Sequence, residues 1–216
     1  MGNVKGIVAF ALITILAIAY SYIYFFKVEE TLPIYQPFDI NPALVDLDLR
    51  NEEDHRISDF KLINHLGDTI SKADVEGQIL VVDFFFTRCA TICPVMSSNL
   101  QLLHDVLPEG VRILSHSVTP VADSVSVLKS YAEKHSADAS KWWFMTGDKT
   151  EVYNLARKSY FSCLDEGDGG YQDFVHTENV VLVDAQGRLR GFYDGTLSNE
   201  ISQLYQDIQA LLQEKK

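Results

Sequence analysis

Ile79-Leu-Val-Val-Asp-Phe-Phe-Phe86 is an apolar run of strand length, and Cys89-Ala-Thr-Ile-Cys93-Pro94 follows it after two residues. A continuous apolar run of this kind predicts a central strand that is buried on both faces. Apolar side chains then recur at helical spacing from Met96 to Leu107, and Pro94 occupies a first-turn position where proline is tolerated. The sequence therefore predicts a strand that delivers two cysteines to the amino end of a helix.

The amino end of a helix favours reactive or metal-binding thiolates, because its free N–H groups and partial positive charge lower the pKa of a thiol. Three residues separate Cys89 from Cys93, where a thioredoxin-like redox site has two. The extra residue widens the gap between the sulfurs and leaves room for a soft metal ion. A purely structural disulfide is the alternative, although a strand–helix junction is more typical of reactive cysteines.

Cys163 is left over when the other two cysteines are paired. Its simplest interpretation is a buried apolar residue, since a free cysteine packs as a small hydrophobic side chain. An auxiliary thiol is the alternative, because Cys163 begins the loop that leads to His176.

The rest of the chain alternates between strand and helix patterns. Strand character is found in residues 111–118, 142–145, 180–183 and 189–193, and helical spacing in residues 123–134, 151–160 and 197–212. A further β-hairpin is predicted over residues 57–70, with its turn at Gly67-Asp68. This alternation, with a hairpin before the last helix, predicts an α/β domain in which helices flank a mixed sheet.

Gly6 to Phe26 is an uncharged apolar run whose length fits a bilayer-spanning helix. A cleaved signal peptide is the alternative, but the run is longer than a usual signal core and ends in aromatic residues where a small-residue cleavage site would lie. Lys5 precedes the run, so we expect a single-pass protein of the inner membrane with its globular part on the outer, periplasmic side. The predicted organisation is a membrane anchor over residues 1–28, a proline-bearing tether over 29–53 and a globular domain over 54–216.

The chain is acidic, with a net charge of −12 and an isoelectric point near 4.8. An acidic surface argues against binding to nucleic acid and against docking on anionic lipid headgroups. It favours a basic or metal-bearing partner instead.

Two thiolates alone hold a metal ion poorly, and His176 is the best-placed third donor. It ends a glycine-bearing loop and precedes a predicted strand, so its ring can lie over the sheet edge near the cysteines. Two thiolates and an imidazole suit Cu(I) and accept Cu(II) with an added ligand, whereas a closed zinc site normally has a fourth protein ligand. Arg88 and the helix end can offset the negative charge of such a site. From the residues alone, a packing histidine remains the alternative.

Four stretches of the chain together resemble the Sco/SenC family. They are Phe85-Phe-Thr-Arg-Cys89-Ala-Thr-Ile-Cys93-Pro94, Leu114-Ser-His-Ser-Val118-Thr-Pro120, Phe144-Met-Thr-Gly147 and His176-Thr-Glu-Asn-Val-Val-Leu-Val-Asp184. The resemblance runs from about His55 to the C-terminus. It implies a membrane-tethered, thioredoxin-like copper protein that helps to assemble the binuclear copper site of cytochrome c oxidase, with Cys89, Cys93 and His176 as copper ligands.

The chain departs from the family pattern at one position. Many relatives have an aspartate–proline pair where this sequence has Thr119-Pro120, although Asp123 fits a later acidic position. If the missing carboxylate tunes copper binding or partner docking, both are affected in this protein.

Two functions use the same sulfurs. A copper chaperone, which is a metal carrier rather than an enzyme, would hold copper through all three ligands and pass it to the copper-bearing oxidase subunit. A thiol–disulfide oxidoreductase would attack a partner disulfide with Cys89 and resolve the mixed disulfide with Cys93, and it would not require His176. A peroxidase of the peroxiredoxin type is a third hypothesis, but Thr87-Arg-Cys89 lacks the proline-framed Thr-x-x-Cys of that chemistry.

Overall fold

The computed structural model describes residues 2–25, 31–163 and 177–214, and it divides the chain into two compact units, residues 1–31 and 32–216. The first unit contains helix α1 (Gly2–Phe25). In the described ranges of the chain, no helix is both long enough and apolar enough to cross a membrane. The helix predicted over residues 6–26 is therefore present, whereas the prediction that it spans a membrane is not supported.

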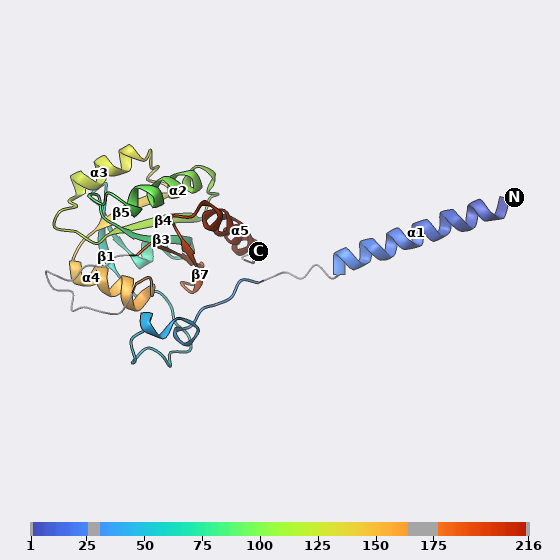
Figure 1. Ribbon diagram of the computed structural model, residues 1–216, viewed down its shortest axis with the longest axis horizontal. Coiled ribbons are helices and arrows are strands. Elements are labelled where there is room, and N and C mark those ends of the chain that lie inside the picture. Colours follow the sequence, from blue (N-terminus) through green and yellow to red (C-terminus); the bar gives the residue numbers. More distant parts are fainter. Residues whose placement is uncertain (1, 26–30, 164–176, 215–216) are drawn as a thin grey trace. The chain divides into compact units, whose positions relative to one another are not determined.

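The second unit is built on a mixed sheet (Figure 1). Within the described residues, the sheet has seven strands in the order β2-β1-β5-β4-β3-β6-β7. Their bounds are β1 Lys61–Asn64, β2 Thr69–Ser71, β3 Ile79–Phe85, β4 Val111–Ser117, β5 Trp142–Thr146, β6 Asn179–Val183 and β7 Leu189–Asp194. The strands β3, β4 and β5 are parallel, while β1 and β6 join them in antiparallel register.

Helices cover both faces of this sheet. Figure 1 shows α2 (Ile92–Val106), α3 (Val125–Lys134) and α5 (Ser198–Glu214) on one face and α4 (Lys149–Asn154) on the other. The helix predicted over residues 151–160 is divided, because a π-helical turn (Leu155–Ser159) continues directly from α4. Alternation along β3 supplies both cores, with Val81 and Phe85 packing under α2 and Val82 and Phe84 packing on the opposite face.

Residues 32–53 belong to the same compact unit as the sheet. Tyr35 forms a bridge to Leu189 at the free edge of β7, and Ile40 and Val45 are buried in the core. The division between the two units falls between residues 31 and 32, so residues 32–53 are part of the unit that contains the sheet. Burial of a few apolar side chains is enough to hold this irregular segment on the domain.

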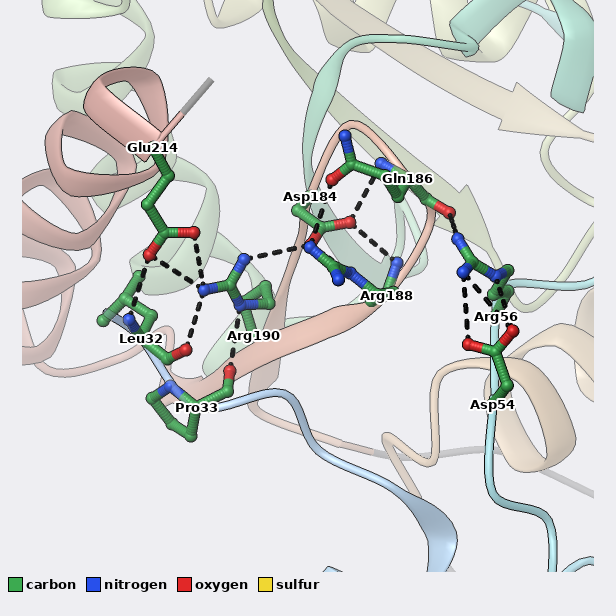
Figure 2. A network of polar contacts seen from close by, with 9 residues as sticks. All are labelled: Leu32, Pro33, Asp54, Arg56, Asp184, Gln186, Arg188, Arg190 and Glu214. Atoms are coloured by element: carbon green, nitrogen blue, oxygen red, sulfur yellow. Dashed lines mark hydrogen bonds and ion pairs between the residues drawn. The ribbon is translucent and has the colours of Figure 1, made fainter. Parts of the chain in front are cut away.

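Arg190, on β7, fixes the first residues of this segment (Figure 2). Its guanidinium donates to the carbonyl oxygens of Leu32 at 2.7 Å and Pro33 at 2.9 Å. It also pairs with Glu214 of α5 at 2.8 Å and with the buried carboxylate of Asp184 at 3.0 Å. A single buried cation therefore joins the incoming chain, the sheet edge and the last helix.

We expect Arg190→Met to lower the free energy of unfolding by about 3 kcal/mol, because it leaves the buried Asp184 carboxylate with too little positive charge. Arg188 also pairs with Asp184 but is more exposed, so Arg188→Met is the matched control and should cost about 1 kcal/mol or less. Urea denaturation of the two variants measures the difference. Equal losses would show that Arg190 is an ordinary surface partner.

Candidate metal site at the amino end of helix α2

The cysteine pair lies where the sequence predicts, between the end of β3 and the start of α2. A turn over residues 86–89 follows β3 and is closed by the Cys89 N–H, which donates to the Phe86 carbonyl at 3.2 Å. Cys89 precedes α2 and is partly exposed, whereas Cys93 lies in the first helical turn and is only 3% exposed. One sulfur is thus open to a partner, and the other is sheltered.

The two thiols differ in acidity. Burial raises the pKa of Cys89, but hydrogen bonds from Cys93 and Thr91 outweigh it and bring the pKa down to about 7. One of these bonds runs from the Cys93 N–H to the Cys89 sulfur at 3.4 Å. Burial, followed by the contact with Cys89, raises the pKa of Cys93 to about 12. Cys89 is therefore the sulfur that ionises near neutral pH.

Asp83 is a polar neighbour that sequence reasoning missed. It is a single carboxylate inside the apolar strand β3, and it accepts a short hydrogen bond from the Ser115 hydroxyl, which in turn accepts from the Trp142 indole at 2.8 Å. Burial raises the pKa of Asp83 to about 7, and its charge contributes to the raised pKa of Cys93. A lone acidic residue in an otherwise apolar run was the available signal.

Among the candidate auxiliary residues, Asp123 is fully buried. It accepts two hydrogen bonds from Thr87, which lies in the turn that leads to Cys89. Arg88 is exposed in the turn, directly before Cys89. Cys163 is buried in the core on the opposite sheet face from Cys93 and forms no disulfide. The structure therefore places Asp123 against Thr87, two residues before Cys89, and Cys163 on the other face of the sheet.

His176 lies outside the described residues, but the chain on both sides of its loop is fixed. The Ser162 carbonyl accepts from the Thr177 hydroxyl at 2.5 Å and from the Asn179 amide at 2.8 Å. Thr177, the residue after His176, is buried. The described residues before and after the stretch 164–176 therefore come together at one place.

That place lies at the same end of the sheet as the cysteines. Strands β3 and β6 are antiparallel, with Leu80 opposite Val183 and Val82 opposite Val181. Because of this register, the carboxyl end of β3, which leads to Cys89, lies beside the amino end of β6, which follows His176.

Gly195 allows α2 to pack close to this end of β6. A Cβ atom built on Gly195 would lie 2.6 Å from Cγ of Met96 and 2.8 Å from Cγ2 of Val180, so no side chain fits there. The Gly195 carbonyl accepts from the Asn99 amide at 2.9 Å, and its N–H donates to the Glu178 carbonyl at 2.8 Å. The turn at Gly195 thus connects the cysteine-bearing helix with the segment that follows His176.

In the parts of the chain that the structure describes, no group of three or more histidine, cysteine, aspartate or glutamate side chains is arranged to hold a metal ion. The set of Cys89, Cys93 and His176 therefore stays a prediction. The other histidines, which show no ligand spacing, are all buried. They are His55, His65, His104, His116 and His135.

Comparison with known proteins agrees with the fold and the motif. A family model described as SCO1/SenC matches residues 49–213. A SCO1/SenC family lipoprotein from Bacillus anthracis is 27% identical, with a TM-score of 0.64 over 76% of this chain and 98% of that chain. BsSco, described as a member of the Sco family of cytochrome c oxidase assembly proteins with a disulfide switch, is 28% identical, with a TM-score of 0.63 over 73% and 94% of the two chains.

Bradyrhizobium japonicum ScoI, solved with copper bound, shares the fold at 20% identity, with a TM-score of 0.57 over 72% of this chain and 99% of that chain. Together these structures confirm the predicted thioredoxin-like α/β fold with a mixed sheet.

We expect iodoacetamide to modify Cys89 well before Cys93 and Cys163 in the folded, reduced protein. Below pH 7 Cys89 is mostly a thiol and above pH 7 mostly a thiolate, so its rate of modification should rise through about pH 7 and then level off. Peptide mass spectrometry of samples quenched at successive pH values gives the three rates. Thr91→Val, which removes one hydrogen bond to the Cys89 sulfur, should move the midpoint to higher pH. Similar rates at all three cysteines would contradict the assigned asymmetry.

Proposed function

This chain belongs to the SCO1/SenC family, and on that premise we propose that it binds one copper ion and delivers it to the subunit of cytochrome c oxidase that holds the binuclear copper site. The observation that carries the proposal is the pair of unbridged thiols at the amino end of α2, beside the start of β6. Family relatives are described as oxidase assembly proteins and as copper-bound, which agrees with this function.

Copper is the cargo of this site, and its ligands would be Cys89, Cys93 and His176. Two thiolates and an imidazole favour Cu(I), and Cu(II) would be held with an added ligand. Binding would displace the proton of Cys93, whose pKa is about 12, so copper affinity should increase with pH. The helix end would stabilise the charge of the bound thiolates.

Release would use the exposure of Cys89. An incoming thiolate of the oxidase subunit can approach copper from the side of this sulfur and replace the ligands one after another. No electron is transferred in this exchange, because each step replaces one copper–ligand bond by another.

The second candidate function is thiol–disulfide exchange, which the low pKa of Cys89 favours. The Cys89 thiolate would attack a disulfide of the oxidase subunit and release one of its thiolates. Cys93 would then lose its proton, attack the Cys89 sulfur of the mixed disulfide and release the second thiolate. The Cys89–Cys93 pair would be oxidised to a disulfide, and the partner disulfide would be reduced to two thiols.

Anaerobic titration of the reduced protein with Cu(I), in competition with a chromophoric Cu(I) chelator, tests the proposal and separates the two functions. We expect one equivalent to bind and His176→Ala to weaken binding at least tenfold, as expected for loss of one of three ligands. Cys163→Ala, which removes a thiol on the other sheet face, is the control and should bind like the wild type. If His176→Ala retained wild-type affinity, the chaperone function would be rejected, and thiol exchange would be favoured.

We also propose that α1 attaches the protein to the membrane, with the remainder on the outer, periplasmic side. The exposed side chains of α1 between residues 6 and 20 are almost all apolar, and the similar Bacillus anthracis protein is described as a lipoprotein. We expect the full chain to stay with membranes washed in alkaline carbonate and residues 32–216 to be released. External protease should digest the domain in spheroplasts. Release of the full chain by carbonate would reject the attachment.

A further inference from the structure

We propose that Asp123 is a positioning residue for the cysteine pair, because it holds the turn that carries Cys89 in place through Thr87. This inference rests on the proposed function and deepens it. The evidence is a cluster of hydrogen bonds that joins two loops at the end of the sheet where the cysteines lie.

Both carboxylate oxygens of Asp123 are engaged. Oδ1 accepts from the Thr87 hydroxyl at 2.5 Å, and Oδ2 accepts from the Thr87 N–H at 3.2 Å. Oδ2 also accepts from the hydroxyls of Ser117 at 2.6 Å and Thr119 at 2.9 Å. Four donors converge on a side chain that is fully buried. An ionised carboxylate, which only accepts, fits this arrangement, whereas an asparagine would turn an NH₂ group towards donors.

Two of these donors belong to a rigid frame. Ser117 ends β4, and the Val118 N–H donates to the Phe85 carbonyl at 2.9 Å, which extends the pairing of β4 with β3. The loop beyond β4 is closed by the Asp123 N–H, which donates to the Thr119 carbonyl at 2.9 Å. Asp123 therefore has a fixed position relative to the central strands.

Thr87 is the only one of these donor residues that belongs to the turn between β3 and α2. The turn is closed by the bond from Cys89 to Phe86, and Thr87 stands at its corner with its N–H and its hydroxyl bonded to Asp123. Without these bonds the corner is free to move, and the 3.4 Å contact between the Cys89 sulfur and the Cys93 N–H moves with it. Asp123 thus sets the position of the Cys89 sulfur relative to the Cys93 N–H through Thr87.

The same geometry argues against Asp123 as a copper ligand. Its side chain has no exposure, and both oxygens are already occupied by donors from the protein. A merely structural role predicts a loss of stability alone, whereas positioning also predicts a change at the cysteines. The two roles can be separated by measurement.

The test compares Asp123→Asn, Thr87→Val, Thr87→Ser and the double variant Asp123→Asn/Thr87→Val in the full chain. We expect Asp123→Asn to weaken Cu(I) binding about tenfold and to slow alkylation of Cys89 at pH 7, as is typical when a residue that orients a ligand is lost. Thr87→Val should act in the same direction, and Thr87→Ser should recover most of the loss, because it keeps the hydroxyl. Ser124→Ala, next in the chain and exposed, is the matched control.

The double variant decides whether Asp123 acts through Thr87. A shared route predicts that the double variant weakens Cu(I) binding by much less than the product of the two single effects. A full product, or wild-type affinity and alkylation in folded variants, would overturn the inference. If Asp123→Asn does not fold, the comparison of Thr87→Val with Thr87→Ser decides the matter alone. If the wild type binds no Cu(I), the proposed function fails, and the alkylation rates still test the positioning of Cys89.

Discussion

The antiparallel register between β3 and β6 is the constraint on which the candidate site depends. It pairs Val82 with Val181 and so brings the end of β3 beside the start of β6. The first of these ends leads to the cysteine turn, and the second follows His176. Gly195 completes the arrangement, because the absence of a side chain there lets Met96 of α2 pack against Val180. Shape complementarity at one glycine and one pair of strands thus brings the cysteine turn and the segment after His176 to the same end of the sheet.

The chemistry of the site follows from an unequal pair of thiols. Cys89 is partly exposed with a pKa near 7, and Cys93 is buried with a pKa near 12. An exposed thiolate can accept or release a soft metal ion and can also attack a disulfide. The two proposed functions therefore both use the Cys89 thiolate, and they differ in whether an imidazole is needed. Burial of Cys93 and the helix end near it serve both functions equally well.

Local hydrophobic patterns in the sequence predict much of this fold. The features that they do not predict depend on contacts between residues far apart in the chain. The apolar run of β3 and the helical spacing after Pro94 predict the strand–helix junction, because both signals are periodic and local. The environments of Asp83 and Asp123 are not predictable in this way, since their partners Ser115 and Thr87 lie more than thirty residues away in the chain. Residues 32–53 have the composition of a linker, but Ile40 and Val45 bury enough apolar surface to hold them on the domain.

The copper proposal rests on membership of the SCO1/SenC family and on the thioredoxin-like fold. Its central claim is the set of three copper ligands. The X-ray absorption spectrum of the Cu(I)-loaded full chain tests that claim most directly. The account predicts a first shell of two sulfurs and one nitrogen, with the nitrogen absent in His176→Ala. A shell of sulfur alone in the wild type, or a nitrogen that persists unchanged in the variant, would contradict it.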